Sequence, residues 1–210
     1  MGMTDYFIIP KYALWVGDYI NENLKPGDKI AWLGQQQMDK YSDMFLTIEK
    51  NIKIENLEHH FYDILNDDDP PVKNRWDIHE SWENKIKGYD LVLGIRIAYL
   101  VQSASGLVKN FKYAVENNKK VLFDFNTGNI VDDGRGKKIQ SWTKGSKNLI
   151  PHFSKVLPSE VSGCFVPDKD SLLSEDTLSS VGLKLNMENV KITQDPVKWR
   201  YYVLAEIIKK

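Results

Sequence analysis

Residues 85–129 constrain the fold more than any other stretch, because they predict a strand, a helix and a second strand in succession. Residues 89–95 form an almost unbroken apolar run, and residues 121–125 form another that ends at an Asn-Thr-Gly-Asn turn sequence. Between them, residues 103–118 carry apolar side chains at helical spacing. Short apolar runs bounded by turn residues are typical of buried strands. Two such strands joined by a helix form a right-handed crossover unit of a parallel sheet.

The same alternation of strand and helix continues through much of the chain. Residues 56–63 could extend the strand before them or begin a helix. The pattern predicts a doubly wound α/β fold, in which a mostly parallel sheet has helices on both faces and ends in an antiparallel strand pair. The segments that we expect outside the central stretch are a helix at 11–24, a strand at 29–34, a helix at 36–50, strands at 52–55 and 72–77, a helix at 171–181 capped by Gly182, and strands at 190–193 and 199–208.

Composition and charge fit a single soluble domain. The chain has 210 residues, of which 42% are hydrophobic and 27% are charged, and its net charge is -1. This balance provides no basic field for nucleic acid or an anionic membrane, and no apolar run approaches the roughly 20 residues of a membrane helix. Because the lone Cys164 cannot form an internal disulfide, we expect a reducing compartment, the cytoplasm. We expect one domain over 1–210, with an N-terminal helical segment (about 1–27) and an insertion (about 129–170) that shapes the substrate side.

The loops after the predicted strands are the places where a ligand would bind. In open parallel sheets, ligands occupy the carboxyl ends of the strands at the point where the strand order reverses. The first of these loops is far from a G-x-G-x-x-G or P-loop sequence, which weighs against dinucleotide and nucleoside-triphosphate binding. The loop positions are 34–37, Glu55, 77–80, 94–99 and 124–128.

In this order the segments resemble a class I S-adenosylmethionine-dependent methyltransferase, a Rossmann-like fold, from about residue 28 to 210. Residues 29–37, Lys-Ile-Ala-Trp-Leu-Gly-Gln-Gln-Gln, resemble the family's first strand and a degenerate glycine-rich loop that keeps only Gly34. Residues 89–94, Tyr-Asp-Leu-Val-Leu-Gly, resemble its fourth strand, and 107–125 resemble the following helix and fifth strand. The last two predicted strands, at 190–193 and 199–208, resemble the antiparallel strand pair by which methyltransferases differ from nicotinamide-binding Rossmann domains.

The resemblance implies a binding site for S-adenosylmethionine. Glu55 would accept hydrogen bonds from both ribose hydroxyls, with Glu58 as a competitor and a plain surface position as the alternative. Asp77 would accept a hydrogen bond from the exocyclic amine of adenine while its apolar neighbour packs on the ring; the alternative is that Asp77 caps a helix. The implied cofactor-binding residues are Gly34, Gln35, Glu55, Asp77, Ile78 and Gly94.

The loops after the fourth and fifth strands are where the family holds the methyl acceptor. Arg96 could bind an anionic substrate or the cofactor carboxylate, or it could pair with a neighbouring acid. Tyr99 follows it as a second substrate-binding candidate. Asp124 could be a general base or a turn-former, and Asn126 could face the acceptor. No histidine spacing such as H-E-x-x-H occurs, so we expect no metal site.

The function that the resemblance implies is methyl transfer from S-adenosylmethionine to an unidentified acceptor, with S-adenosylhomocysteine as the product. The acceptor could be a small molecule, including one of nucleotide or sugar type. We expect no nucleic-acid or membrane partner, and the oligomeric state stays open. The depleted glycine loop favours an alternative, a non-catalytic methyltransferase-like binding or scaffold protein. A third alternative, another doubly wound enzyme that acts on a nucleotide sugar or uses a nicotinamide, predicts that the last two strands extend the parallel sheet.

Overall fold

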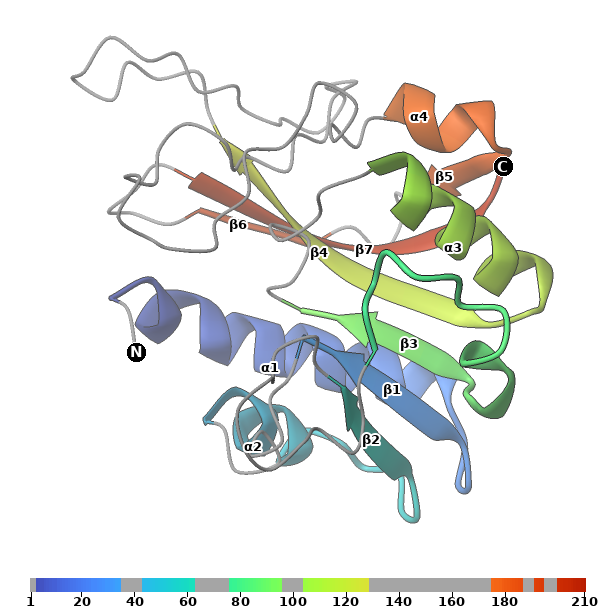
Figure 1. The fold of residues 1–210 in the computed structure, drawn as a ribbon. Coiled ribbons are helices and arrows are strands. Elements are labelled where there is room, and N and C mark those ends of the chain that lie inside the picture. The colour runs from blue at the N-terminus through green and yellow to red at the C-terminus, as the bar shows by residue number, and fades with distance from the viewer. Residues whose placement is uncertain are drawn as a thin grey trace, which may run out of the picture.

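The structure is a computed structural model that describes residues 3–34, 43–62, 76–95, 104–128, 175–186, 191–194 and 200–210. Figure 1 shows one central sheet with helices on both of its faces. Within the described ranges, no helix combines the length and the apolar character needed to cross a membrane. The elements are α1 (Met3–Asn23), β1 (Lys29–Leu33), α2 (Asp43–Glu49), β2 (Glu58–Tyr62), the 3₁₀ helix η2 (Ile86–Gly88), β3 (Leu91–Gly94), α3 (Ala104–Glu116), β4 (Lys120–Gly128), α4 (Glu175–Ser180), β5 (Leu183–Leu185), β6 (Lys191–Gln194) and β7 (Arg200–Lys209).

The sheet has seven strands in the order β2-β1-β3-β4-β7-β5, and β6 also pairs with β7. β2, β1, β3 and β4 run parallel, whereas β7 runs antiparallel to β4. The other side of β7 holds β6 along residues 201–204 and β5 along residues 207–209, both antiparallel. The predicted doubly wound, mostly parallel sheet with an antiparallel pair at its end is confirmed. Because β7 reverses direction, the alternative in which the last strands extend the parallel sheet is wrong.

Alternate residues of β1, β3 and β4 belong to two apolar clusters. One cluster lies under α1 and α2, and the other lies under α3 and α4. Burial on both faces is the reason that these strands read as nearly continuous apolar runs in the sequence. The strands contribute Ile30, Trp32, Leu91, Leu93 and Leu122 to the first cluster, and Ala31, Leu33, Val92, Val121 and Phe123 to the second.

Most predicted elements have counterparts in the structure. β3, α3 and β4 confirm the predicted strand, helix and strand of the central stretch. α1 includes most of the helix expected at 11–24, and α4 lies within the helix expected at 171–181. β5 is a strand that the sequence analysis did not predict. Of the strand expected at 72–77, Trp76 and Asp77 form no strand, and residues 72–75 lie outside the described residues. The insertion expected at 129–170 also lies outside them.

β2 begins later than predicted, and the strand expected at 52–55 is wrong. A turn at Asn56, whose φ is +59, precedes β2, and asparagine tolerates this left-handed conformation better than most residues. The Gly27 N–H donates to the Asn56 carbonyl (3.0 Å), and the Glu58 N–H donates to the Asp28 carbonyl (3.0 Å). Pairing with β1 therefore starts only after the turn. Residues 58–62 are thus a strand and not a helix, but they begin β2 and do not extend a strand at 52–55.

A buried carboxylate links the first helix to the last strand. Glu206 of β7 is 8% exposed. Its Oε1 accepts a hydrogen bond from the Tyr19 hydroxyl of α1 (2.7 Å), and its Oε2 accepts one from the side-chain amide of Asn186 (2.9 Å). Burial, and then the contact with Glu206, raise the pKa of the Tyr19 hydroxyl above its ordinary value, so this group remains a donor. Both carboxylate oxygens thus have partners, as a buried charge requires.

Replacing Glu206 by alanine should destabilise the protein. The change leaves the buried Tyr19 hydroxyl without its acceptor, which costs roughly 1–3 kcal/mol, and it also removes the acceptor of the half-buried Asn186 amide. Glu206→Gln is the matched control, because its amide oxygen can still accept from Tyr19 in a side chain of the same shape, and its loss should be smaller. Urea unfolding followed by circular dichroism measures both variants. A Glu206→Ala protein as stable as the wild type would show that this contact contributes no stability.

Candidate functional site

The strand order reverses between β1 and β3. The chain runs from β1 to β2 on one side of β1 and then returns to place β3 on its other side. In a parallel sheet this reversal opens a crevice at the carboxyl ends of the two strands. Leu33 at the end of β1 pairs with Gly94 at the end of β3, so the chain leaves the sheet on adjacent strands at Gly34 and Ile95. This carboxyl edge is the candidate site.

Gly34 turns the chain at this edge. Its φ is +72, in the left-handed region that a side chain disfavours. The backbone can therefore bend directly after a buried strand, which is how glycine loops bring main-chain N–H groups close to a ligand. The structure places Gly34 at the switch point, as expected, whereas its contact with a cofactor stays a prediction. Gln35 lies outside the described residues.

Gly94 has a packing role that the sequence analysis did not foresee. It lies opposite Phe123 of β4 in the sheet register. A Cβ atom at position 94 would approach the Phe123 ring to 2.4 Å, which is closer than real contacts allow. The aromatic ring thus occupies the space that a side chain would need. The absence of a side chain at Gly94 is explained by the core under α3, without a ligand.

Glu55 lies at the opposite edge of the sheet from Gly34. It belongs to the turn before β2, whose carboxyl end is Tyr62, so the prediction that Glu55 ends the second strand is wrong. Its competitor Glu58 begins β2 at that same amino edge and forms an ion pair with Lys29 (2.7 Å). The acid that follows β2 in the sequence is Asp63, outside the described residues. The alternation of Leu57, His59 and Phe61 was the sequence signal that could have placed the carboxyl end of β2 at Tyr62.

A return segment, residues 76–90, carries the next two predicted residues. Because β3 runs parallel to β1, the chain must come back to the amino edge before β3 begins. Trp76 packs against Tyr62 at the end of β2, with ring centroids 5.2 Å apart, so the segment starts beside that strand end. At its other end, the Tyr89 hydroxyl forms a hydrogen bond with that of Tyr62. Apart from η2, the return segment contains no helix.

Asp77 and Ile78 have defined roles within the return segment. Ile78 is 3% exposed and belongs to the cluster under α3, so its side chain fills the core and does not lie open to a ligand. Asp77 Oδ1 accepts the backbone N–H of His79 (2.9 Å) and lies 2.9 Å from the Nδ1 atom of the same histidine. Asp77 therefore stabilises a local turn, a role close to the capping alternative.

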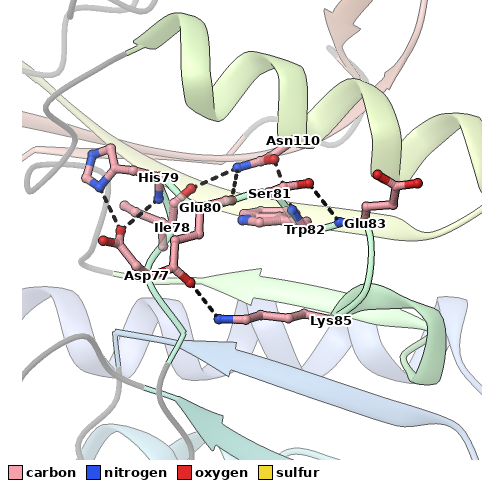
Figure 2. A network of polar contacts seen from close by, with 9 residues as sticks. All are labelled: Asp77, Ile78, His79, Glu80, Ser81, Trp82, Glu83, Lys85 and Asn110. Atoms are coloured by element: carbon pink, nitrogen blue, oxygen red, sulfur yellow. Dashed lines mark hydrogen bonds and ion pairs between the residues drawn. The ribbon is translucent and has the colours of Figure 1, made fainter.

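Asn110 of α3 holds the return segment in place (Figure 2). It is 6% exposed, and its amide donates hydrogen bonds to the carbonyls of Ile78 (3.0 Å) and Glu80 (2.8 Å). Its side-chain oxygen accepts the backbone N–H of Trp82 (3.2 Å). Buried backbone groups outside helices and strands need such partners. The sequence analysis missed Asn110, although a polar residue three positions after Leu107, on the apolar side of a predicted helix, was an available signal.

β4 extends past the carboxyl end of β3. β3 ends opposite Phe123, whereas β4 continues to residue 128 beside β7. Asp124 and Asn126 therefore lie within a paired strand, which corrects the turn expected directly after residue 125. The reason is that β7 supplies a second partner beyond the point where β3 stops.

Two further predicted residues, Arg96 and Tyr99, lie outside the described part of the chain.

His59 of β2 belongs to an aromatic cluster with Trp32 and Phe45. The Trp32 indole N–H donates to His59 Nδ1 (3.0 Å), so the neutral ring carries its proton on Nε2. Burial, and to a lesser degree the neighbouring His60, lower the pKa of His59 below its ordinary value of 6.5. This histidine has a structural role. Among the described residues, no three His, Cys, Asp or Glu side chains are grouped so as to hold a metal ion.

The stability of the protein should fall as the pH drops below 6.5, the ordinary pKa of histidine, because of His59. Below that pH the unfolded chain takes up a proton that the folded ring resists, so the free energy of unfolding decreases. Melting temperatures at about pH 7.5 and about pH 5.5 measure this loss, which should be smaller in His59→Gln than in the wild type. His60→Gln is the control, since that side chain is 39% exposed. Equal losses in the wild type and His59→Gln would contradict this account.

Comparison with known proteins identifies a fold. No protein-family model matches the chain, and no curated protein matches it. Among solved structures, the trans-methyltransferase CalH in complex with SAH aligns with a TM-score of 0.56 and 11% identity, over 97% of this chain and 59% of that one. The CMeT domain of the citrinin polyketide synthase gives 0.56 and 10% identity, over 96% and 55%. The DszA carbon methyltransferase gives 0.52 and 13% identity, over 96% and 54%.

These likenesses show the fold alone. The chain has a methyltransferase-like α/β fold, with a parallel sheet that ends in antiparallel strands. It spans between 54% and 59% of the length of the three proteins with which it aligns.

Proposed function

We propose that the protein binds S-adenosylmethionine at the carboxyl edge of its sheet and transfers the methyl group to an acceptor beside it. The observation that carries this proposal is the strand reversal between β1 and β3, marked by the left-handed Gly34, within a methyltransferase-like fold. One protein of this fold, CalH, is in complex with SAH. The bound cofactor supplies the electrophilic methyl group, and the chain supplies the binding groups and the alignment of the acceptor.

Three residues of the chain suit the cofactor. Gly34 lets the backbone bend at the edge and present N–H groups without a side chain in the way. Asp63, next in sequence to the carboxyl end of β2, takes the role predicted for Glu55, because an acid after this strand can accept hydrogen bonds from the ribose hydroxyls. Gln35 offers an amide that can donate to the cofactor carboxylate.

The extension of β4 supports an acceptor site on the other side of the switch point. Residues 124–128 continue beyond the end of β3 along the same edge. In this proposal Asp124 takes the proton that the acceptor oxygen or nitrogen loses, and Asn126 helps to hold the acceptor. Arg96 and Tyr99, which follow β3 in the sequence, complete the acceptor side, and an arginine suits an anionic acceptor such as a nucleotide or a phosphorylated sugar. Alignment of the two reactants is the main requirement of the transfer.

A non-catalytic binding module is the second candidate function. One feature that favours it is the three glutamines at 35–37, which stand at positions where the loops of methyltransferases usually have glycines. Another is Gly94, because the Phe123 ring occupies the space beside it that a ligand would need. Such a module would bind the nucleoside or a partner at the same edge without transferring a methyl group.

Thermal unfolding with S-adenosylhomocysteine tests the cofactor site. A ligand at about 100 times its Kd stabilises a protein by about 2.7 kcal/mol, so Tm should rise by several degrees. Asp63→Asn should lose most of this rise. Glu55→Ala is the matched control, because it removes an acid at the opposite end of β2, and it should keep the rise. The proposal is wrong if millimolar ligand leaves the wild-type Tm unchanged.

Methyl transfer distinguishes the enzyme from the binding module. The protein is incubated with S-adenosylmethionine that carries a deuterated methyl group and with a small-molecule extract, and labelled products are identified by mass spectrometry. For an acceptor that needs a base, Asp124→Asn should slow product formation roughly 10²–10⁴-fold while S-adenosylhomocysteine binding is unchanged. Cofactor binding without any labelled product favours the module.

A further inference from the structure

The amino edge of the sheet, opposite the candidate site, is rich in lysine along one half. β3, β4 and β5 begin at this edge, and β7 ends there because it runs antiparallel to β4 and β5. Figure 1 shows this edge on the right of the view, where the C-terminus lies beside β5. We call the lysines of these strand ends, and of the turn and the 3₁₀ helix next to them, the lysine edge: Lys87, Lys119, Lys120, Lys184, Lys209 and Lys210.

Acidic side chains do not balance the lysine edge. Within the described residues, none of its lysines forms an ion pair. Glu116 at the end of α3 pairs with Lys112 (3.7 Å), and Glu206 is buried with both of its carboxylate oxygens bonded. Among the acids that the structure describes in this half, half-buried Asp90 is therefore left to oppose the lysines.

The other half of the same edge, at β1 and β2, has no such excess. Lys29 and Glu58 form an ion pair there (2.7 Å). The remaining lysines of this half are matched by acids, with Lys25, Lys50 and Lys53 against Asp28, Glu49 and Glu55. The net charge of -1 for the whole chain therefore conceals a positive region, because the excess of lysine is confined to one half of one edge.

The ends of helices explain only part of the lysine edge. A lysine that follows a helix stabilises the partial negative charge of the last carbonyl groups, and Lys119 and Lys120 follow α3 in this way. Lys209 is instead the last residue of β7, and Lys184 lies within β5. The backbone N–H of Lys210 donates to the Gly182 carbonyl (2.8 Å), which holds this end of the chain beside β5. A second reason is needed for these three lysines.

We propose that the lysine edge binds the phosphate backbone of a nucleic acid. Adjacent strands lie about 4.8 Å apart, so the four strand ends extend over roughly 15 Å. A nucleic-acid duplex carries one negative charge per about 1.7 Å of its axis, so several phosphates face a surface of this width. This local surface corrects the expectation, drawn from the net charge, that the protein has no nucleic-acid partner. The inference does not rest on the proposed function, because it concerns the opposite edge of the sheet.

The described surface suits a nucleic acid better than an anionic membrane. Proteins that lie on a membrane combine basic residues with apolar side chains that enter the headgroup region. The large exposed apolar side chains of the described residues are Leu14 of α1 and Leu46 of α2, and neither belongs to the lysine edge. Phosphate contacts of a nucleic acid need no such apolar group, since lysine binds phosphate as a point charge.

The salt dependence of RNA binding tests this inference. The full chain, without a terminal tag, is titrated into a fluorescein-labelled polyuridylate of about 30 nucleotides at about 50 and about 200 mM salt, and fluorescence anisotropy measures the affinity. Each lysine that neutralises a phosphate of a single strand steepens the slope of log affinity against log salt by about 0.7. With roughly four such contacts, the affinity should fall about 50-fold between the two salt concentrations.

A variant that combines Lys184→Gln, Lys209→Gln and Lys210→Gln should reduce this slope by about 2, because it removes three positive charges from the lysine edge. The matched control combines Lys25→Gln, Lys50→Gln and Lys53→Gln, which removes the same charge from the balanced half and should keep most of the slope. Melting temperatures verify that both variants are folded.

The inference is overturned if the wild type does not bind polyuridylate at the lower salt concentration, or if the two variants lose affinity equally. Phosphatidylserine vesicles are a second probe, and sedimentation of the protein with these vesicles without any binding of polyuridylate would also overturn it, in favour of a membrane surface. The rise of Tm with S-adenosylhomocysteine tests the proposed function separately, and the variant of the lysine edge should keep it.

Discussion

Burial of β1, β3 and β4 on both faces is the constraint on which the rest of the structure depends. Each of these strands sends alternate residues into the cluster under α1 and α2 and the cluster under α3 and α4. Neither face can be left uncovered, because parallel strands of this kind expose apolar residues on both sides. The helices must therefore divide between the two faces, and the chain must reverse its direction of winding between β1 and β3. That reversal brings the carboxyl ends of β1 and β3 side by side at one edge of the sheet, which is where ligands bind in open parallel sheets.

The return segment shows how the protein builds a defined surface with little regular structure. A helix provides hydrogen-bond partners for its own backbone groups. In residues 76–85, the buried side chain of Asn110 provides partners for three backbone groups instead. Two of its three hydrogen bonds hold the carbonyls of Ile78 and Glu80, and the third holds the backbone N–H of Trp82. Packing of α3 on the sheet and the course of the return segment are thus coupled through a single amide.

Particular residues show what sequence patterns could predict and what they could not. β3 and β4 were predictable because two-sided burial makes their apolar runs nearly continuous, and α3 was predictable because its apolar residues recur at helical spacing. β2 was misplaced because Ile52 and Ile54 alternate like a strand but pack against the cluster under α1 and α2 from outside the sheet. The position of Gly34 at the carboxyl end of a strand was predictable, because it directly follows the apolar run of that strand. The packing of Gly94 on Phe123 and the contact between Asn110 and the return segment depend on three-dimensional register between distant residues, which no local pattern records.

The bond between Tyr19 and Glu206 joins positions 187 residues apart. α1 also packs on the sheet through Ala13, Val16 and Ile20, which share a cluster with Leu204 of β7. Contacts between such distant parts of a chain slow folding, because a long loop must close before they form. During synthesis the first helix emerges long before its partners in the last strand exist. Its apolar face can pack on Phe45 and Ile48 of α2 as soon as that helix forms, whereas its contacts with β7 form only after β7 has been synthesised.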